Sequence, residues 1–337
     1  MRLLKLIGCA ILFAPIAAQG QNWHLEYGPN RQVVIYSTLD NSYPGGSVTD
    51  FQLMLAIPPL MPGRQNIQAE MHVIGCKNYQ SVQGTKPGRS LIYEHLWFQP
   101  GIHQINFDIS YTGSLQACRI VPGSPAQPAP ALTKAESHEF LSQNSELDFK
   151  APSFRSFMEQ NGLLRRAGES DIDLAWRFFR YITQKYHYGG GPPHILTKLA
   201  VGPGSDCGGI SEIFTGMCRF SGIPARLLVG RNVGINDKIE NSYHVQSEFY
   251  VPRVGWIPVD ATFGLQQGKG AAQFFGNRHA NFLVCEYDVD LPLKQKDCNG
   301  ETIANSKLGI LQGPCLWIGG TGNLAAQTNN TWKVYFP

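Results

Sequence analysis

The strongest signal in the chain is the segment Gly204-Ser-Asp-Cys-Gly-Gly-Ile-Ser-Glu-Ile-Phe214. Its centre is Cys207, which lies where a glycine-flanked loop enters a helix predicted to run to about Phe220 and to end at Ser221-Gly222. A helix N-terminus carries partial positive charge, and this charge stabilises a thiolate. We therefore expect Cys207 to be a nucleophilic thiol. The alternative is a buried cysteine that packs as a small hydrophobic residue, a description that also suits Cys218 near the far end of the same helix.

Two later segments supply the partners that such a thiol needs. The strand-like segment Ser242-Tyr-His-Val-Gln-Ser-Glu-Phe-Tyr250 carries His244, and Val254-Gly-Trp-Ile-Pro-Val-Asp-Ala-Thr262 ends a second strand at Asp260. The 16 residues between His244 and Asp260 (260 − 244) suit two neighbouring strands joined by a turn. A carboxylate placed there can orient an imidazole and stabilise its positive charge. Taken singly, the histidine could equally be a core or surface residue and the aspartate a turn residue.

These segments, with Phe220-Ser-Gly-Ile-Pro-Ala-Arg226 between them, resemble the core of the transglutaminase-like superfamily. The resemblance covers about residues 30 to 290. It implies that Cys207 is the nucleophile, His244 the general base and acid, and Asp260 the orienting carboxylate. It also implies an α+β fold: a papain-like core, in which the helix that carries the cysteine packs on an antiparallel sheet, preceded by a β-sandwich.

The chain departs from the family pattern at two positions beside the predicted triad. Gln246 stands where the family usually has an aromatic residue, and Asp-Ala-Thr replaces Asp-Pro-Thr. Both changes bear on substrate preference more than on the chemistry.

Other residues near the predicted triad have expected supporting roles. Asp206 is expected to cap the cysteine helix, and Arg226 to hold a turn. The Cys207 N–H is the natural first donor of an oxyanion hole. Trp176, Tyr188 and His194 are candidates for the second donor.

The pattern along the chain divides it into five parts. Residues 1–20 read as a signal peptide, 21–121 as a β-sandwich of short alternating strands, and 122–135 as a proline-rich linker. Residues 136–290 form the predicted catalytic domain. Residues 291–337 are predicted to be short strands and loops, with no role assigned.

The N-terminus predicts a secreted or periplasmic protein. A basic head containing Arg2 and Lys5 precedes an apolar run of about a dozen residues, which is the size of a signal-peptide core and too short to span a bilayer. The alternative is a buried N-terminal helix. We expect no integral membrane segment in the mature chain.

Charge and cysteine content restrict the partners. The chain has 28 basic and 25 acidic side chains and no lysine-arginine run, so nucleic acid is not expected as a partner.

The cysteines predict one disulfide. Without Cys9 of the signal peptide, seven cysteines are left (8 − 1), and Cys76 with Cys118 is the favoured disulfide. Since CxxC pairs and an acidic calcium loop are both absent from the sequence, we expect no metal and no cofactor.

The predicted function is acyl transfer through a cysteine thioester, on peptide or glutamine carboxamide bonds of a protein or peptide substrate. Water as acceptor gives a protease or deamidase, and a lysine amine gives a transglutaminase; the triad does not distinguish them. The alternative is a catalytically silent or latent binding or scaffold protein on the same fold.

Overall fold

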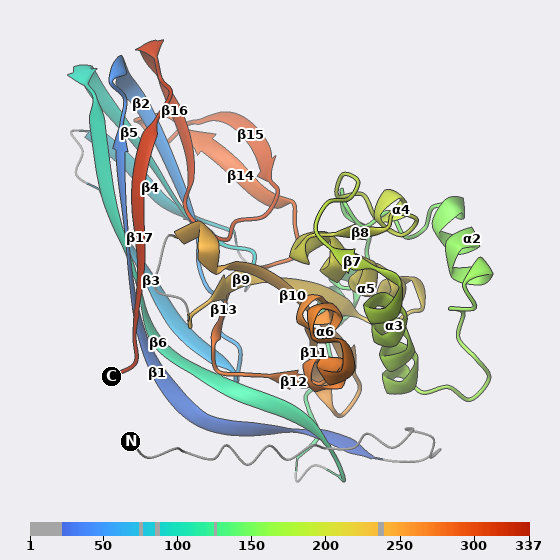
Figure 1. Ribbon diagram of the computed structural model, residues 1–337. Coiled ribbons are helices and arrows are strands. Elements are labelled where there is room, and N and C mark those ends of the chain that lie inside the picture. The colour runs from blue at the N-terminus through green and yellow to red at the C-terminus, as the bar shows by residue number, and fades with distance from the viewer. Residues whose placement is uncertain (1–21, 74–76, 85–87, 125–126, 235–238) are drawn as a thin grey trace.

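The computed structural model describes residues 22–73, 77–84, 88–124, 127–234 and 239–337. Figure 1 shows long twisted strands on one side, helices on the other, and a four-stranded sheet between them. The predicted α+β fold is therefore confirmed. The predicted signal peptide lies outside the described residues. Within the described ranges, no helix is long and apolar enough to cross a membrane.

Two antiparallel sheets form the β part of the molecule. The first has the order β12-β6-β1-β17, with β3 also paired to β6. Its strands are β1 (Trp23–Ser42), β3 (Gln65–Val73), β6 (Gln104–Pro122), β12 (Asn277–Arg278) and β17 (Gln327–Tyr335). The second has the order β16-β2-β5-β4. Its strands are β2 (Gly45–Ala56), β4 (Lys77–Gln83), β5 (Leu91–Ile102) and β16 (Cys315–Asn323).

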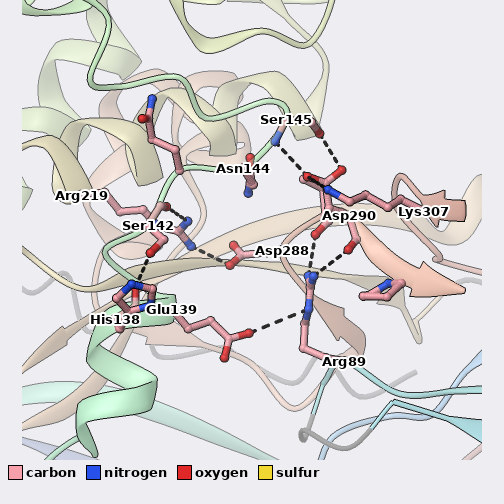
Figure 2. A pocket seen from close by; sticks show the side chains of 13 residues that line it. Arg89, His138, Glu139, Ser142, Asn144, Ser145, Arg219, Asp288, Asp290 and Lys307 are labelled. Atoms are coloured by element: carbon pink, nitrogen blue, oxygen red, sulfur yellow. Dashed lines mark hydrogen bonds and ion pairs between the residues drawn. The ribbon is translucent and has the colours of Figure 1, made fainter. Parts of the chain in front are cut away.

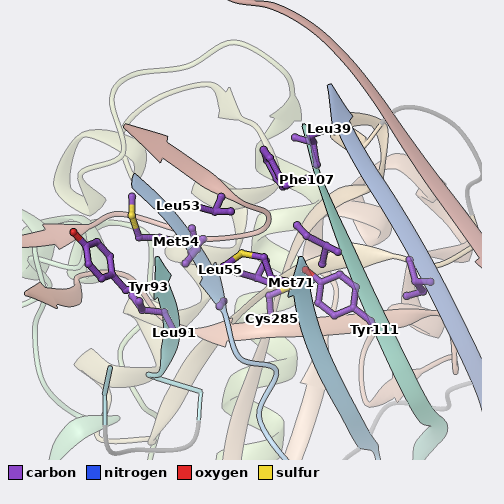
Figure 3. Close-up of a cluster of buried hydrophobic side chains, with 14 of the residues drawn as sticks. Leu39, Leu53, Met54, Leu55, Met71, Leu91, Tyr93, Phe107, Tyr111 and Cys285 are labelled. Atoms are coloured by element: carbon purple, nitrogen blue, oxygen red, sulfur yellow. The ribbon is translucent and has the colours of Figure 1, made fainter. Parts of the chain in front are cut away.

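Apolar residues of both sheets gather in one core. In β1, Val33 and Ile35 are fully buried while their neighbours are more exposed, which is the two-residue period of a strand with one buried face. Figure 3 shows the cluster, to which β2, β3, β5 and β6 contribute. Cys285 of β13 (Phe282–Tyr287) lies in the same cluster. The β part therefore shares its core with the sheet that carries the predicted site.

The predicted catalytic part is a helix on an antiparallel sheet. Helix α5 (Cys207–Phe220) packs on the sheet β11-β10-β9-β13, whose other strands are β9 (Ala225–Asn232), β10 (Tyr243–Val251) and β11 (Gly255–Val259). Buried hydroxyl groups join the two layers: Ser211 donates to the Val245 carbonyl at 3.0 Å, and Thr215 lies 3.1 Å from Ser247. Surrounding helices are α2 (Pro152–Gln160), α3 (Asp171–Lys185), α4 (Leu196–Leu199) and α6 (Ala261–Gln267).

The C-terminal segment returns to the β part. After the hairpin β14 (Leu291–Lys296) and β15 (Thr302–Leu308), β16 pairs with β2 and β17 pairs with β1. Each sheet therefore combines strands from both ends of the sequence. Residues 291–337, to which the sequence assigned no role, complete both sheets.

The proline-rich segment is partly ordered by contacts that its composition does not predict. Ala129 donates to the Arg253 carbonyl at 2.9 Å. Helix α1 (Lys134–Glu139) begins inside the predicted linker, where Thr133 and Glu136 form a reciprocal capping box. The Thr-x-x-Glu spacing in the sequence is the pattern that could have predicted the start of this helix.

The six described cysteines carry free thiols. Cys118 is buried opposite Arg278 of β12, and Cys76 lies outside the described residues. The predicted Cys76–Cys118 disulfide therefore stays a prediction, because one of its two cysteines lies outside the described residues. Cys218 is fully buried in the core, as its position on the helix predicts.

Candidate active site

Cys207 is the first residue of α5 and is partly exposed. Asp206 caps the helix as predicted, because its side chain accepts a hydrogen bond from the Gly209 N–H at 3.1 Å. The short parallel pair β7 (His187–Tyr188) and β8 (Gly204–Ser205) leads directly into this turn. The thiol therefore lies at the positive end of a 14-residue helix.

His244 and Asp260 are brought together by neighbouring strands. His244 is near the start of β10, Asp260 follows β11, and His244 Nε2 lies 2.7 Å from Asp260 Oδ2. The other carboxylate oxygen, Oδ1, accepts the Phe263 N–H at 2.9 Å, so Asp260 also caps α6. The rings of Phe263 and Phe282 enclose the imidazole, with Phe263 stacked at 4.6 Å.

The electrostatics of this pair favour a charged imidazole. Burial opposes the charge on His244, which is only 4% exposed. The attraction and hydrogen bond of Asp260 outweigh it, and a smaller electrostatic contribution from Cys207 adds to them, so the pKa of His244 rises to about 9. With Nε2 on Asp260, Nδ1 is the nitrogen left for the thiol.

Gln246 is a third member of this hydrogen-bonded group. Its Nε2 donates at 3.0 Å to the same Asp260 oxygen that binds His244. The sequence marks Gln246 as a departure from the family pattern, but its bond to Asp260 is visible only in the structure.

His194 lies beside the cysteine helix in a different set of contacts. Its Nε2 is 3.2 Å from Asp206 Oδ1 and its Nδ1 is 2.6 Å from Glu212 Oε1. The hydrogen bonds of Asp206 and Glu212 raise the pKa of His194 to about 10. The pKa of neighbouring Glu146 is raised to about 7, mainly by burial and to a smaller extent by repulsion from Glu212. Sequence reasoning missed both glutamates, although Glu212 is the one acidic residue of a mainly apolar helix.

The other two oxyanion candidates occupy different environments. The Trp176 ring stacks on Phe179 with centroids 5.4 Å apart and packs against the helical core. Tyr188 is 48% exposed, and its strand pairs with Ser205, two residues before Cys207. Burial is the main cause that raises the pKa of the Tyr188 hydroxyl, and the nearby Cys207 adds a smaller increase.

Arg226 lies in the core of the molecule, away from the thiol. Its Nε donates to Glu248 Oε1 at 2.6 Å, and Arg64 from the β part binds the other oxygen of the same carboxylate. Trp256 and Tyr287 face the Arg226 guanidinium at 4.0 and 3.7 Å. These contacts fit the structural role expected of Arg226.

A separate cavity of about 530 Å³ contains none of the predicted triad. Figure 2 shows it between the segment 138–145, the end of α5 and the hairpin β14–β15. Its charged groups pair with one another: Arg219 is 2.6 Å from Asp288, and Lys307 is 3.8 Å from Asp290. The candidate active site is therefore a different surface from this cavity.

Comparison with known proteins agrees with this geometry. Residues 163–261 match the model of the transglutaminase-like superfamily core, and this range contains Cys207, His244 and Asp260. Over residues 163–261, the resemblance predicted from the sequence is confirmed.

Individual relatives are distant. An uncharacterized protein of Haemophilus influenzae is 27% identical over 119 residues, which are 26% of this chain and 32% of the relative, so the match spans about a third of that protein. A proposed cysteine protease of Cytophaga hutchinsonii has a TM-score of 0.52 at 12% identity and covers 92% of this chain and 100% of its own. The periplasmic domain of TgpA from Pseudomonas aeruginosa has a TM-score of 0.34 at 13% identity, covering 68% and 93%. The Cytophaga protein shares the fold of this chain.

Proposed function

We propose that this chain is an exported thiol acyl enzyme that cleaves or exchanges peptide or glutamine carboxamide bonds. Cys207 is the nucleophile, His244 the general acid and base, and Asp260 the residue that orients His244. The observation that carries the proposal is the buried His244–Asp260 pair, joined at 2.7 Å on the sheet against which the helix that begins at Cys207 packs. The export part of the proposal rests on the basic head and apolar run of residues 1–20.

The reaction follows from these roles. The Cys207 sulfur attacks the carbonyl carbon, and the C–N bond breaks as His244 gives its proton to the departing ammonia or amine. A thioester on Cys207 is left. Water or a second amine then attacks this thioester, gives its proton to His244, and releases Cys207. Atoms and charge balance in both steps without a metal ion or a redox partner.

The developing oxyanion needs at least one fixed donor. The Cys207 backbone N–H, at the free start of α5, supplies the first. We assign the second to Tyr188, because it is exposed beside Cys207, whereas Trp176 packs in the core and His194 is held by two carboxylates. Its hydroxyl is a donor of the required kind.

The test is the rate at which iodoacetamide alkylates Cys207 between about pH 4 and pH 9, mapped by mass spectrometry under non-reducing conditions. We expect a rate that stays high in the acid half of this range. We expect that advantage to disappear in His244→Ala, and the partly exposed Cys298 in the same sample serves as the comparison thiol. His138→Ala, which removes an exposed histidine, is the matched control.

Two results would overturn the proposal. One is a Cys207 that reacts like Cys298 whether or not His244 is present. The other is a Cys207 found in a disulfide. Either would favour a latent or catalytically silent binding protein.

A further inference from the structure

Three side chains that can bind a metal ion converge beside α5. They are Glu146 from the segment before α2, His194 from the segment before α4, and Glu212 from α5 itself. One ligand atom of each lies within 4.8 Å of the others. The three segments are far apart in sequence, so the fold brings this group together.

The two nitrogens of His194 have separate roles. Nδ1 faces Glu212 at 2.6 Å, whereas Nε2 is held by the Asp206 carboxylate at 3.2 Å. Histidine ligands of metals typically use one ring nitrogen for the metal and donate the other N–H to a carboxylate, which fixes the ring and its tautomer. His194 has this arrangement, with Nδ1 directed at the two glutamates.

Glu212 supplies an independent indication of a missing cation. The residue is 1% exposed, and its Oε2 has no hydrogen-bond donor in the described part of the chain. A buried carboxylate oxygen without a donor is strongly unfavourable. Besides its bond to His194, Glu212 faces another carboxyl, that of Glu146, with an oxygen of each within 4.8 Å of the other. A cation between the two would satisfy both.

The backbone holds the ligands in place. The Glu146 N–H donates to Asn144 Oδ1 at 3.0 Å, and the Glu146 carbonyl accepts the Leu196 N–H at 2.8 Å, which joins the Glu146 segment to the start of α4. Gly208 allows the imidazole to lie against α5, because a Cβ there would come within 2.8 Å of His194 Cε1. Glu146 and His194 are both partly exposed, which leaves a route for the ion and room for water ligands.

We propose that Glu146, His194 Nδ1 and Glu212 form a binding site for a divalent transition metal ion such as Zn²⁺ or Mn²⁺. One imidazole and two carboxylates are ligands that suit these ions. The metal occupies the place of the proton shared by His194 and Glu212. It links three segments around the start of α5, so its effect is to stabilise that region. This proposal is independent of the thiol chemistry of Cys207.

The experiment uses the full chain, without a histidine tag and dialysed against a chelator. Mn²⁺ is titrated by calorimetry, and Co²⁺ is followed by its visible absorption, in which a thiolate ligand would show as an intense charge-transfer band. We expect one ion per chain, a Co²⁺ spectrum without the thiolate band, and a rise in Tm on binding. Glu146→Gln and His194→Gln should weaken binding by about 10-fold to 100-fold or more.

His138→Gln, an exposed histidine on α1, is the matched control and should bind as the native chain does. Circular dichroism of the metal-free variants checks that each is folded; Glu146→Gln is the milder change, because Glu146 is only partly buried. Absence of saturable binding, binding unchanged in both Glu146→Gln and His194→Gln, or a spectrum dominated by thiolate would overturn the proposal. In each of these cases the alkylation behaviour of Cys207 would still test the proposed function separately.

Discussion

At the scale of single residues, Asp260 determines the charge state of His244. Burial alone would lower the pKa of this histidine, and Asp260 is the main group that raises it to about 9. In Asp260→Asn, burial is no longer opposed by a carboxylate, so we expect the pKa of His244 to fall below 6.5. NMR titration of the histidine ring measures this directly, with the exposed His138 as internal reference. A His244 that still titrates near pH 9 would contradict this account.

The same shift predicts how stability depends on pH. A histidine whose folded pKa is raised stabilises the protein below its unfolded pKa of 6.5, and this stabilisation is lost as pH rises to about 9. The difference corresponds to at most about 3 kcal/mol. Asp260→Asn should remove this pH-dependent loss of stability. Urea unfolding at pH 6 and pH 9 should therefore show a smaller fall in the free energy of unfolding for the variant than for the native chain.

The sequence predicts these residues unequally well. Cys207, His244 and Asp260 could be predicted as site residues because each lies within a short motif at a recognisable spacing, and the structure joins His244 to Asp260. The Glu146–His194–Glu212 group was not predicted. Its members lie on three segments with no shared spacing, so only the packing of those segments reveals it.

At the scale of single elements, β13 carries a buried acid that titrates near neutral pH. Glu286 is fully buried, and a register shift of β13 against β9 between Val284 and Glu286 accompanies its placement. Its Oε1 accepts the Leu311 N–H, while Oε2 has no partner among the described residues. Burial raises the pKa of Glu286 to about 8.

This carboxyl should weaken the fold as the pH rises. Between about pH 4.5 and pH 8 the folded chain holds a proton that the unfolded chain has lost, so the free energy of unfolding falls across that range. Glu286→Gln keeps an acceptor for Leu311 and removes the titration. We expect the variant to be about 1–3 kcal/mol more stable than the native chain at pH 9. Urea unfolding checks this, and a variant that is less stable at pH 9 would show that Glu286 is ionised and paired in the fold.

Elements with a strong local pattern were predicted well. The helix predicted from Cys207 to about Phe220 has those bounds in the structure, and the strand-like segment 242–250 differs from β10 by one residue at each end, because caps and apolar periodicity act within the segment. Strands β12, β16 and β17 were not resolved from the sequence. Each is defined by pairing with β6, β2 or β1, which lie far away in the chain, and no local pattern records such a partner.

At the scale of the whole molecule, the C-terminal strand connects the β part to the predicted catalytic sheet. Trp332 of β17 is fully buried, with its ring 6.0 Å from that of Tyr111 on β6. The guanidinium of Arg231 on β9 lies 4.4 Å from the Trp332 ring. Arg231 also binds the carbonyl of Gln312, whose side chain donates to the His244 carbonyl at 2.8 Å. A continuous set of contacts therefore runs from β17 to the strand of His244.

Trp332→Ala tests whether this connection makes the two parts one cooperative unit. Loss of a fully buried tryptophan should reduce the free energy of unfolding by about 3–5 kcal/mol. Because Arg231 loses the surface on which it packs, we expect one unfolding transition at lower temperature, seen alike by calorimetry and by hydrogen exchange in β10. Tyr335→Ala, on the same strand but 51% exposed, should change stability by less than about 1 kcal/mol. If β10 instead kept its protection while the β sheets unfolded separately, the C-terminal strands would serve the β part alone, and the predicted catalytic core would be stable without them.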